Sequence, residues 1–185
     1  RGRAGMNKRK LDARTIALVA IMAAVTCVFT LLIRIPIAPT RGYIHLGDVA
    51  ATFGALAFGP WFGLFIAGGG TALADLLGGY PNWAPLTFVI HGLQGFVAGY
   101  VAYLGRHRLR SMLIGAVLGE IIVVAGYFLV ELPLYGVGPA LAELPGNAIQ
   151  GLFGLLGVPL LVMVARAYPP LLLHGGPRVG SDNDR

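Results

Sequence analysis

Polar side chains capable of hydrogen-bond recognition recur at helical spacing within an otherwise apolar chain. Glu120, Tyr127 and Glu131 share one helix face with Val124, because residues three and four apart lie on the same side of a helix. Carboxylates and phenols at membrane depth are costly and commonly mark a functional site. We therefore treat this stripe as a candidate wall of a ligand pocket, in which a few polar groups orient a ligand between apolar surfaces.

Two further stripes have the same character. Thr87, His91 and Gln94 share a face of one segment, and Asn147 and Gln150 share a face of another. Each polar group has a simpler interpretation, since amide and imidazole side chains also form hydrogen bonds that hold membrane helices together. An ionised carboxylate at the depth of Glu120 needs a partner, so we expect it to be protonated or bonded to His91 or Gln94.

Three other acidic residues are explained more simply by local structure. Asp48 and Glu143 each lie near an expected helix start, where a carboxylate favours the helix dipole, and we predict a capping role for both. Asp75 lies near the end of its helix, where the dipole is unfavourable. We therefore expect a cationic partner for it, Arg34 or Arg41.

The composition indicates what positions these residues. Of 185 residues, 56% are hydrophobic and 12% are charged, against roughly 25% charged in soluble domains. The 28 glycines fit a helical membrane protein, where they permit close helix contact, as in the GxxxG pairs Gly59/Gly63 and Gly95/Gly99. The single cysteine, Cys27, excludes a disulfide framework or a thiolate metal cluster within the chain.

The chain divides into a basic segment 1–14, a membrane domain 15–166 and a polar tail 167–185 that we expect to be disordered. We predict an all-α membrane protein with six transmembrane helices. The connectors include a loop at 34–45 and a Pro/Gly-rich segment at 131–139, and Pro159 is expected to kink the last helix. The predicted helices are 15–33, 46–58, 61–79, 85–104, 111–130 and 140–165, the second being too short to cross a bilayer upright.

Charge sets the predicted orientation. With both termini cytoplasmic, twelve of the fourteen Lys and Arg residues lie inside, and only Arg34 and Arg41 lie outside. The net charge of +6 therefore reports membrane topology, and we expect no nucleic-acid partner. In this orientation the three stripes meet in the outer half of the bilayer, which predicts a pocket open to the outside and roofed by 34–45 and 78–85.

The sequence resembles a known family in several segments: IHLGDVAATFGALAFGPWFGLFIAGGG at 44–70, LADLLGGYPNWAP at 73–85, GYFLVE at 126–131 and ALAELPGNAIQG at 140–151. These segments resemble the substrate-binding S components of energy-coupling factor (ECF) vitamin transporters, in the group of riboflavin, hydroxymethylpyrimidine and pyridoxine carriers. The resemblance covers about 11–166. It implies a six-helix protein of a prokaryotic plasma membrane that binds one vitamin without an enzymatic step, a cofactor or a metal.

The resemblance also implies partners and site residues. A transmembrane coupling subunit and two ATPase subunits would complete the transporter, and this chain has no Walker A motif of its own. The docking positions for the coupling subunit are Ala20 and Ala24, with Ala13 and Ala17 as the alternative pair. The substrate-binding candidates are Trp83, His91, Gln94, Tyr127, Glu131, Asn147 and Gln150, with Glu120 as the candidate floor of the pocket.

The ligand and the function class are left partly open. The carboxylate of Glu131 favours a neutral or cationic ligand of the pyridoxine or pyrimidine type over a phosphorylated one, and riboflavin is not excluded. The alternatives are a stand-alone channel or scaffold, or an intramembrane enzyme that uses Glu120 and His91. One histidine and one glutamate are few for a metal site, so no metal is expected.

Overall fold

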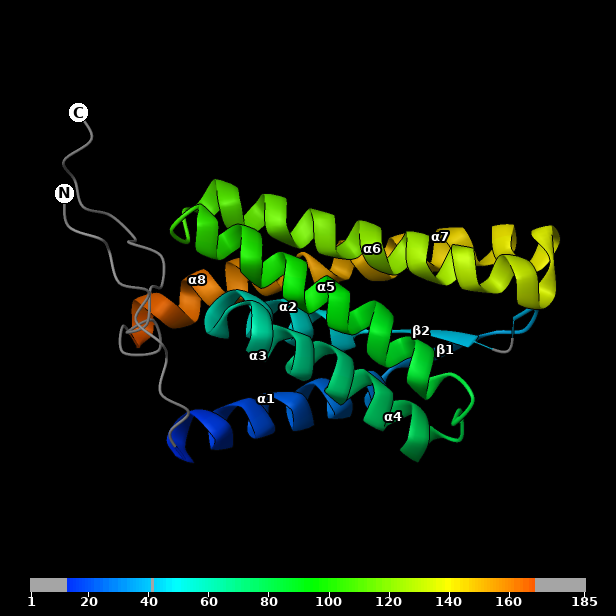
Figure 1. Cartoon of the computed structure of the whole chain (residues 1–185), viewed down its shortest axis with the longest axis horizontal. Coiled ribbons are helices and arrows are strands. Elements are labelled where there is room, and N and C mark those ends of the chain that lie inside the picture. The colour runs from blue at the N-terminus through cyan, green and yellow to red at the C-terminus, as the bar shows by residue number, and fades with distance from the viewer. Residues whose placement is uncertain (1–12, 41, 169–185) are drawn as a thin grey trace.

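The computed structural model describes residues 13–40 and 42–168, and these form a helical bundle that carries one short β hairpin (Figure 1). The predictions for the basic N-terminal segment and the polar tail fall almost entirely outside the described residues. The predicted all-α membrane character is confirmed at the level of the bundle. The short β hairpin was not part of that prediction.

Five helical stretches are long and apolar enough to cross a bilayer. Three of them are the single helices α1 (Ala13–Leu32), α5 (Ala84–Leu104) and α6 (Leu109–Tyr135), which Figure 1 labels. The other two are composite. One joins α3 (Pro60–Leu64), the π-helical turn Phe65–Gly69 and α4 (Gly70–Gly78), and the other joins α7 (Val137–Gly154) and α8 (Gly157–Ala167).

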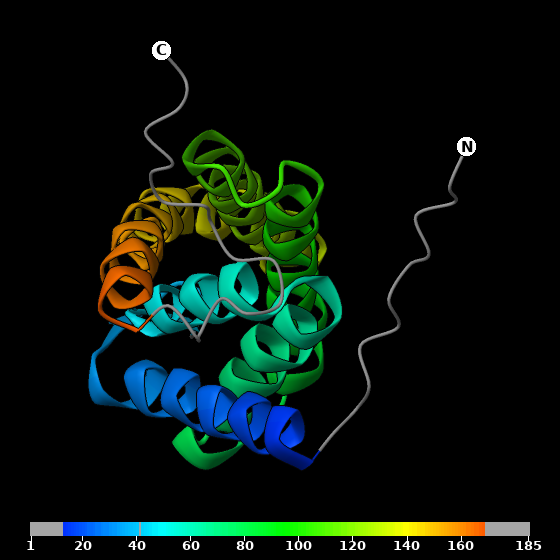
Figure 2. The same ribbon diagram turned by 90° about the vertical axis from the view of Figure 1, so that its left-hand side faces the viewer.

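The shorter helix α2 (Gly47–Phe58) forms the centre of the bundle, with the other helices arranged around it (Figure 2). Ten of its twelve residues are buried, and most of these are alanine, glycine or threonine. Small side chains let six neighbouring helices approach a single central one. The outer helices instead expose many large apolar side chains, as expected for a surface that faces lipid.

Glycine pairs bring the stretch that begins with α3 against α5. A Cβ atom on Gly63 would lie 2.7 Å from the carbonyl oxygen of Gly95, and one on Gly99 would lie 2.7 Å from the carbonyl carbon of Gly59. The two GxxxG pairs noted in the sequence therefore pack on each other. Any larger residue at these positions would force the two helices apart.

The segment 34–45 is an antiparallel hairpin and not the loop that was predicted. Strand β1 (Arg34–Ile37) pairs with β2 (Gly42–His45), with Arg34 opposite His45 and Ile37 opposite Gly42. The prolines in this segment favoured a loop. Pro36 is compatible with the strand because both strands of a two-stranded ribbon are edges, where a missing N–H group can face away from the partner.

The prediction of a connector at 131–139 is also wrong. Helix α6 continues through Pro133 to Tyr135, and α7 begins at Val137, so that only Gly136, at φ +88°, separates them. Prolines within membrane helices are tolerated because neighbouring groups satisfy the freed carbonyls. The break in the last stretch lies at 155–156, and Pro159 occupies the first turn of α8, where its missing N–H costs little.

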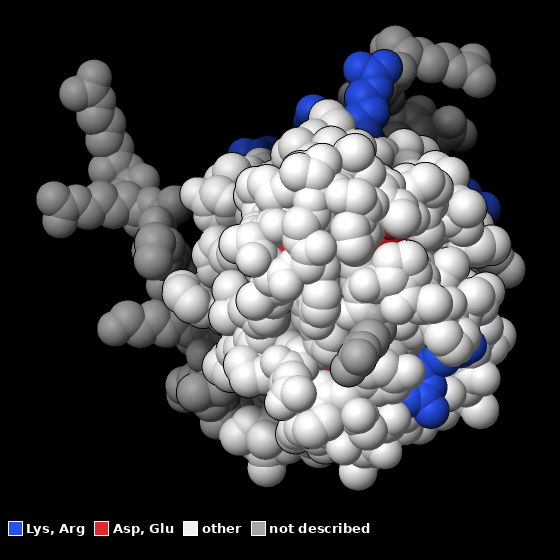
Figure 3. All heavy atoms as spheres, turned by 90° about the vertical axis from the view of Figure 1, so that its right-hand side faces the viewer, with Lys and Arg blue, Asp and Glu red and all other residues white. Residues whose placement is uncertain are grey.

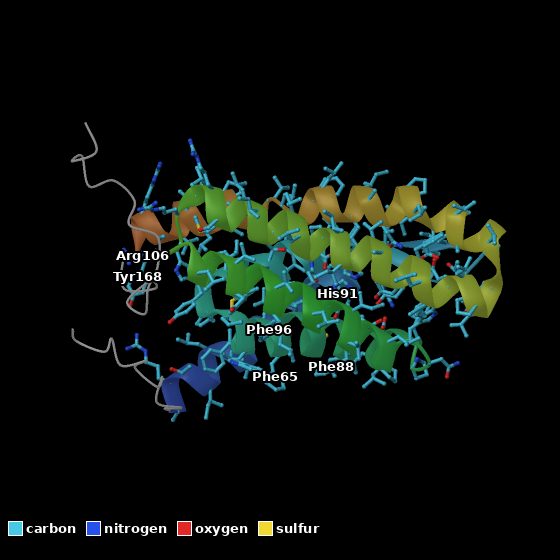
Figure 4. The ribbon with its side chains drawn as sticks, turned by 45° about the horizontal axis from the view of Figure 1, so that its top comes forward. Phe65, Phe88, His91, Phe96, Arg106 and Tyr168 are labelled. Atoms are coloured by element: carbon cyan, nitrogen blue, oxygen red, sulfur yellow. The ribbon has the colours of Figure 1, made fainter. Side chains whose placement is uncertain are left out.

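The two ends of the bundle differ in what they present. The hairpin, the α4–α5 turn and the α6–α7 junction gather at one end (Figure 1). The start of α1, the α5–α6 turn and the end of α8 gather at the other, where Figure 4 labels Arg106 and Tyr168.

Candidate ligand-binding site

A pocket opens at the hairpin end of the bundle, between β2 and the helices α4 to α7. It encloses about 370 Å³ including its open mouth, of which about 20 Å³ is free for the centres of water molecules. Five of the residues predicted from the sequence line it: Trp83, Tyr127, Glu131, Asn147 and Gln150. Five more polar or aromatic residues line it that were not among the predicted ligand contacts: Tyr43, His45, Asp75, Thr87 and Glu143.

Aromatic side chains form one side of this pocket. The rings of Trp83 and Tyr127 have centroids 5.9 Å apart, and Trp83 stacks on Tyr135 at 6.1 Å with an interplanar angle of 25°. The Tyr127 hydroxyl lies 3.1 Å from the Thr87 hydroxyl. This bond fixes the tyrosine ring, so the pocket offers a positioned aromatic surface to a planar ligand.

The predicted residues His91, Gln94 and Glu120 lie beneath the pocket and form a hydrogen-bonded network. Figure 4 shows His91 near the middle of the bundle. Its Nδ1 atom lies 2.7 Å from Gln94 Oε1 and 3.1 Å from Asp48 Oδ1, so Nδ1 faces two acceptors and carries a hydrogen. Gln94 Nε2 donates to Glu120 Oε1 at 3.0 Å, and Thr52 donates to the same oxygen at 3.0 Å. The expected partner of Glu120 is thus Gln94.

Glu120 is also the one polar residue in a separate apolar groove between α6 and α7, which encloses about 860 Å³ including its open mouth. The backbone of α7 approaches the carboxyl group closely at Gly151 and Gly154. Glu120 does not line the main pocket, and Gln94 connects it to the network beneath that pocket.

Gln150 connects this network to the hairpin. Its Oε1 atom accepts a hydrogen bond from the backbone N–H of His45 at 2.9 Å, and its Nε2 atom donates to Asp48 Oδ2 at 2.8 Å. Helix α7 therefore holds the end of β2 and the start of α2 together. One buried amide fixes the position of the strand that covers the pocket.

The capping role predicted for Glu143 is wrong, and the one predicted for Asp48 is confirmed only in its position. Asp48 lies in the first turn of α2, where it favours the helix dipole, but it makes no capping hydrogen bond: it is fully buried and its carboxylate is bonded to His91 and Gln150. Glu143 lies beyond the first turn of α7, which begins at Val137, and it points into the pocket. Sequence reasoning could not see these partners, because each lies on another element of the fold.

Asp75 has a phenolic partner where a cationic one was expected. The Tyr43 hydroxyl donates to Asp75 Oδ1 at 2.6 Å. Arg34 donates instead to the carbonyl oxygen of Gly78 at 3.2 Å, and its guanidinium lies 5.6 Å from the centre of the Tyr43 ring. Arg41, the other predicted partner, lies outside the described residues. Burial and the neighbouring Asp75 carboxylate raise the pKa of Tyr43, so the phenol keeps its proton.

His45, at the end of β2, is held neutral by its surroundings. Burial lowers its pKa to about 4. Its Nδ1 atom accepts a hydrogen bond from the backbone N–H of Gly47 at 3.0 Å, which a protonated Nδ1 could not do.

Three of these residues could by their types hold a metal ion. His45, Asp48 and His91 bring ligand atoms within 4.8 Å of one another. Asp48 and His91 already pair with each other, and His45 Nδ1 with Gly47. We therefore describe the group as part of the hydrogen-bonded network.

The hairpin end of the bundle exposes little acidic charge. Figure 3 shows this end as a mostly uncharged surface, with Lys and Arg atoms towards its edges and acidic atoms visible only as small spots between other residues. On the flank of the molecule, the four alanines of α1 predicted to dock a partner, Ala13, Ala17, Ala20 and Ala24, are all exposed. Ala24 lines a shallow apolar groove with Ile21, Val25, Val28 and Phe29.

An apolar helical bundle with a partly polar, aromatic pocket at one end defines a membrane protein that binds a small molecule. The particular family follows from comparison with known proteins. Residues 10–167 match the model of the ECF-type riboflavin transporter S component family, and the chain belongs to this family of S components of vitamin transporters.

Two relatives are similar over most of the chain. The chain is 32% identical over 166 residues to the thiamine precursor transporter HmpT of Lactococcus lactis subsp. cremoris (strain MG1363), covering 89% of this chain and 91% of that protein. It is 43% identical over 129 residues to an uncharacterized protein of the gap 3′ region of Pyrococcus woesei, covering 70% of this chain and 86% of that protein.

A solved structure supports the fold. An S component of a bacterial ECF transporter superposes with a TM-score of 0.53 over 86% of this chain and 97% of that chain, at 20% identity. The family match over residues 10–167 confirms the predicted family, and this structure supports the fold.

Proposed function

We propose that the chain is the substrate-binding subunit of an ATP-driven ECF importer and captures a small B-type vitamin or precursor in the pocket under the hairpin. The observation that carries this proposal is the pocket itself, because it joins a fixed aromatic surface at Trp83 and Tyr127 to buried polar groups such as Asn147 and Gln150. A mainly apolar concave site with a few placed polar groups suits a small planar ligand.

The pocket favours a small ligand over a large one. With about 20 Å³ free for the centres of water molecules, any ligand must displace side chains, and a single ring displaces fewer than the three fused rings of riboflavin. Pyridoxine or hydroxymethylpyrimidine is therefore the better match. The similarity to a thiamine precursor transporter supports the pyrimidine.

We propose that the pocket faces the outside of a prokaryotic plasma membrane. The positive-inside distribution supports both termini in the cytoplasm, since the end of the bundle that holds Arg106 is opposite to the hairpin end. Counting α2 as a short sixth helix gives the even number of crossings that this orientation requires. Substrate would then enter past the hairpin.

Coupling to ATP hydrolysis would occur through other subunits. We propose that the exposed alanine face of α1, centred on Ala20 and Ala24, docks against a transmembrane coupling subunit that carries two ATPase subunits. Small residues on an exposed membrane face allow another helix to approach closely.

Purified protein tests this function directly. We expect tight binding of one compound from a panel of pyridoxine, hydroxymethylpyrimidine and riboflavin, measured by isothermal titration in detergent. We also expect a coupling subunit and ATPases to co-purify from the native membrane. If no compound of the panel binds and no ATPase co-purifies, the proposal is wrong.

A further inference from the structure

Two buried carboxyl groups meet at the side of the pocket formed by α6 and α7. Glu131 is 1% exposed and Glu143 is 3% exposed, and both line the pocket. The two carboxyl groups lie within hydrogen-bonding reach of each other, so they can share one proton. Apart from this mutual contact, three of their four oxygens, both of Glu131 and Oε2 of Glu143, have no hydrogen-bond partner among the described residues.

Such oxygens are rarely left without a partner. A buried acceptor without a donor retains the cost of its lost hydration, and nearly all buried polar groups in native structures are satisfied. The described cation of the hairpin does not satisfy them, because Arg34 is bonded to the carbonyl of Gly78. A proton shared by the two groups satisfies only their mutual contact, and the remaining acceptors point to hydrogen-bond donors supplied by a ligand.

The number and type of free acceptors define the ligand edge that fits. A protonated 4-aminopyrimidine presents three N–H donors on adjacent atoms, one on the ring nitrogen and two on the amino group. Two of them lie parallel and suit one carboxylate in the bidentate way that guanidinium groups do. The third points sideways and can reach a second carboxylate. A proton shared by Glu131 and Glu143 can pass to the ring nitrogen, which leaves three of their oxygens as acceptors for these three donors.

Other ligand edges fit less well. The pyrimidine edge of riboflavin places a carbonyl on each side of one N–H group, so that two acceptors would face carboxylate oxygens. The donors of pyridoxine are distributed around its ring and form no such row. A phosphate group would bring negative charge towards two carboxyl groups in a site of low polarity, which is costly.

We propose that Glu131 and Glu143 form an amidine clamp, a specificity-determining pair that selects heteroaromatic ligands with a ring nitrogen next to an exocyclic amino group. This inference rests on the proposed function, because it names the ligand class of the same pocket. The ring of such a ligand would lie near Trp83 and Tyr127, which line the pocket together with the clamp. Gly42 of β2 packs directly against Glu143 and limits where its carboxyl group can lie.

The first experiment changes the ligand and leaves the protein unmodified. Isothermal titration compares 4-amino-5-hydroxymethyl-2-methylpyrimidine with its 4-oxo counterpart, which has nearly the same size and a carbonyl in place of the amino group. We expect the amino compound to bind about 10- to 100-fold more tightly, the usual effect of leaving a buried polar group unpaired. Equal affinity for the two compounds would overturn the clamp.

The second experiment changes the protein. Glu131→Gln and Glu143→Gln should each weaken binding of the amino compound by about 10- to 100-fold and leave the affinity for the 4-oxo compound unchanged or improved. Asp12→Asn, which removes the same charge just before α1, is the charge-matched control. Retention of wild-type affinity and selectivity by both glutamine variants would contradict the proposal.

The outcomes separate the clamp from the function on which it rests. If pyridoxine or riboflavin binds tightly and the aminopyrimidine does not, the clamp is wrong and the S-component function stands. If none of these compounds binds and no coupling subunit co-purifies, the proposed function fails and the clamp fails with it. The comparison of two ligands on the unmodified protein does not depend on any variant folding.

Discussion

Replacing Gln150 by alanine should loosen the hairpin that covers the pocket. The amide of Gln150 holds the His45 backbone N–H at 2.9 Å and the Asp48 carboxylate at 2.8 Å, and the residue is 2% exposed. Gln150→Ala removes both bonds at once. Neither water nor another described side chain replaces them without rearrangement, because His45 and Asp48 are also buried.

The expected magnitude follows from the two groups left without partners. Each buried donor or acceptor that loses its partner costs about 1–3 kcal/mol, so the variant loses about 2–6 kcal/mol of stability. For a domain of this size, even the lower bound corresponds to a Tm that falls by roughly 4–8 °C. The loss is local to the contact between α7, β2 and α2, so hydrogen exchange should accelerate at residues 42–48.

Thermal unfolding of the ligand-free protein in detergent measures this effect, and hydrogen exchange locates it. Asn147→Ala is the matched control, since Asn147 lines the same pocket one turn earlier and has no hydrogen bond to the hairpin among the described residues. We expect the control to reduce ligand affinity and to leave the ligand-free Tm nearly unchanged. An unchanged Tm in Gln150→Ala, or an equal fall in both variants, would refute the proposed role of Gln150.

Two further predictions concern coupling and pH. Ala24→Trp should abolish vitamin uptake by the assembled transporter and preserve vitamin binding by the isolated chain. Leu152→Trp, at a position 67% exposed on α7, is the control. Loss of binding in Ala24→Trp would argue against a docking role. The pKa of His45 is about 4 in the folded chain against 6.5 when exposed, so the unfolded state binds more protons between these values and stability falls as the pH drops below about 6.5. At pH 5 the loss of folding stability is about 2 kcal/mol. His45→Asn keeps an acceptor for the Gly47 N–H, and its Tm should be less sensitive to pH between 7 and 5. Identical pH profiles of Tm in the variant and the wild type would count against a buried, neutral His45.

Periodicity predicted the parts of the site that lie on single helices. Thr87, His91 and Gln94 were expected on one face of one helix, and all three are buried on the inner side of α5. Asn147 and Gln150 likewise share the buried face of α7. These predictions succeeded because side-chain direction along a helix depends only on local geometry.

The partners of these residues could not be predicted in the same way. Asp48 follows a glycine at a helix start, and this local pattern is the same for a capping residue and for the centre of a buried network. The bonds that decide between them come from His91 on α5 and Gln150 on α7. Glu143 was misassigned for a related reason, because its helix begins three residues earlier than the sequence suggested.

Prolines explain most errors in the element boundaries. Pro133 was expected to end a helix and Pro36 to lie in a loop, as both would in many soluble proteins. In this fold Pro133 lies inside α6, and Pro36 pairs in a two-stranded ribbon opposite Tyr43. Pro36 is tolerated because both strands of the ribbon are edges, and Pro133 because neighbouring groups in a membrane bundle can satisfy the carbonyl that it frees.

The central position of α2 has a consequence for biogenesis. At 1.5 Å per residue its twelve residues span about 18 Å, well short of a hydrocarbon core of about 30 Å. Asp48 adds a further penalty to insertion as a separate segment. We therefore expect the translocon to release α2 together with the following stretch, as a helical hairpin closed by the sharp turn at Gly59 and Pro60. Glycosylation mapping of nascent chains that end before and after this hairpin would show whether α2 can enter the bilayer alone.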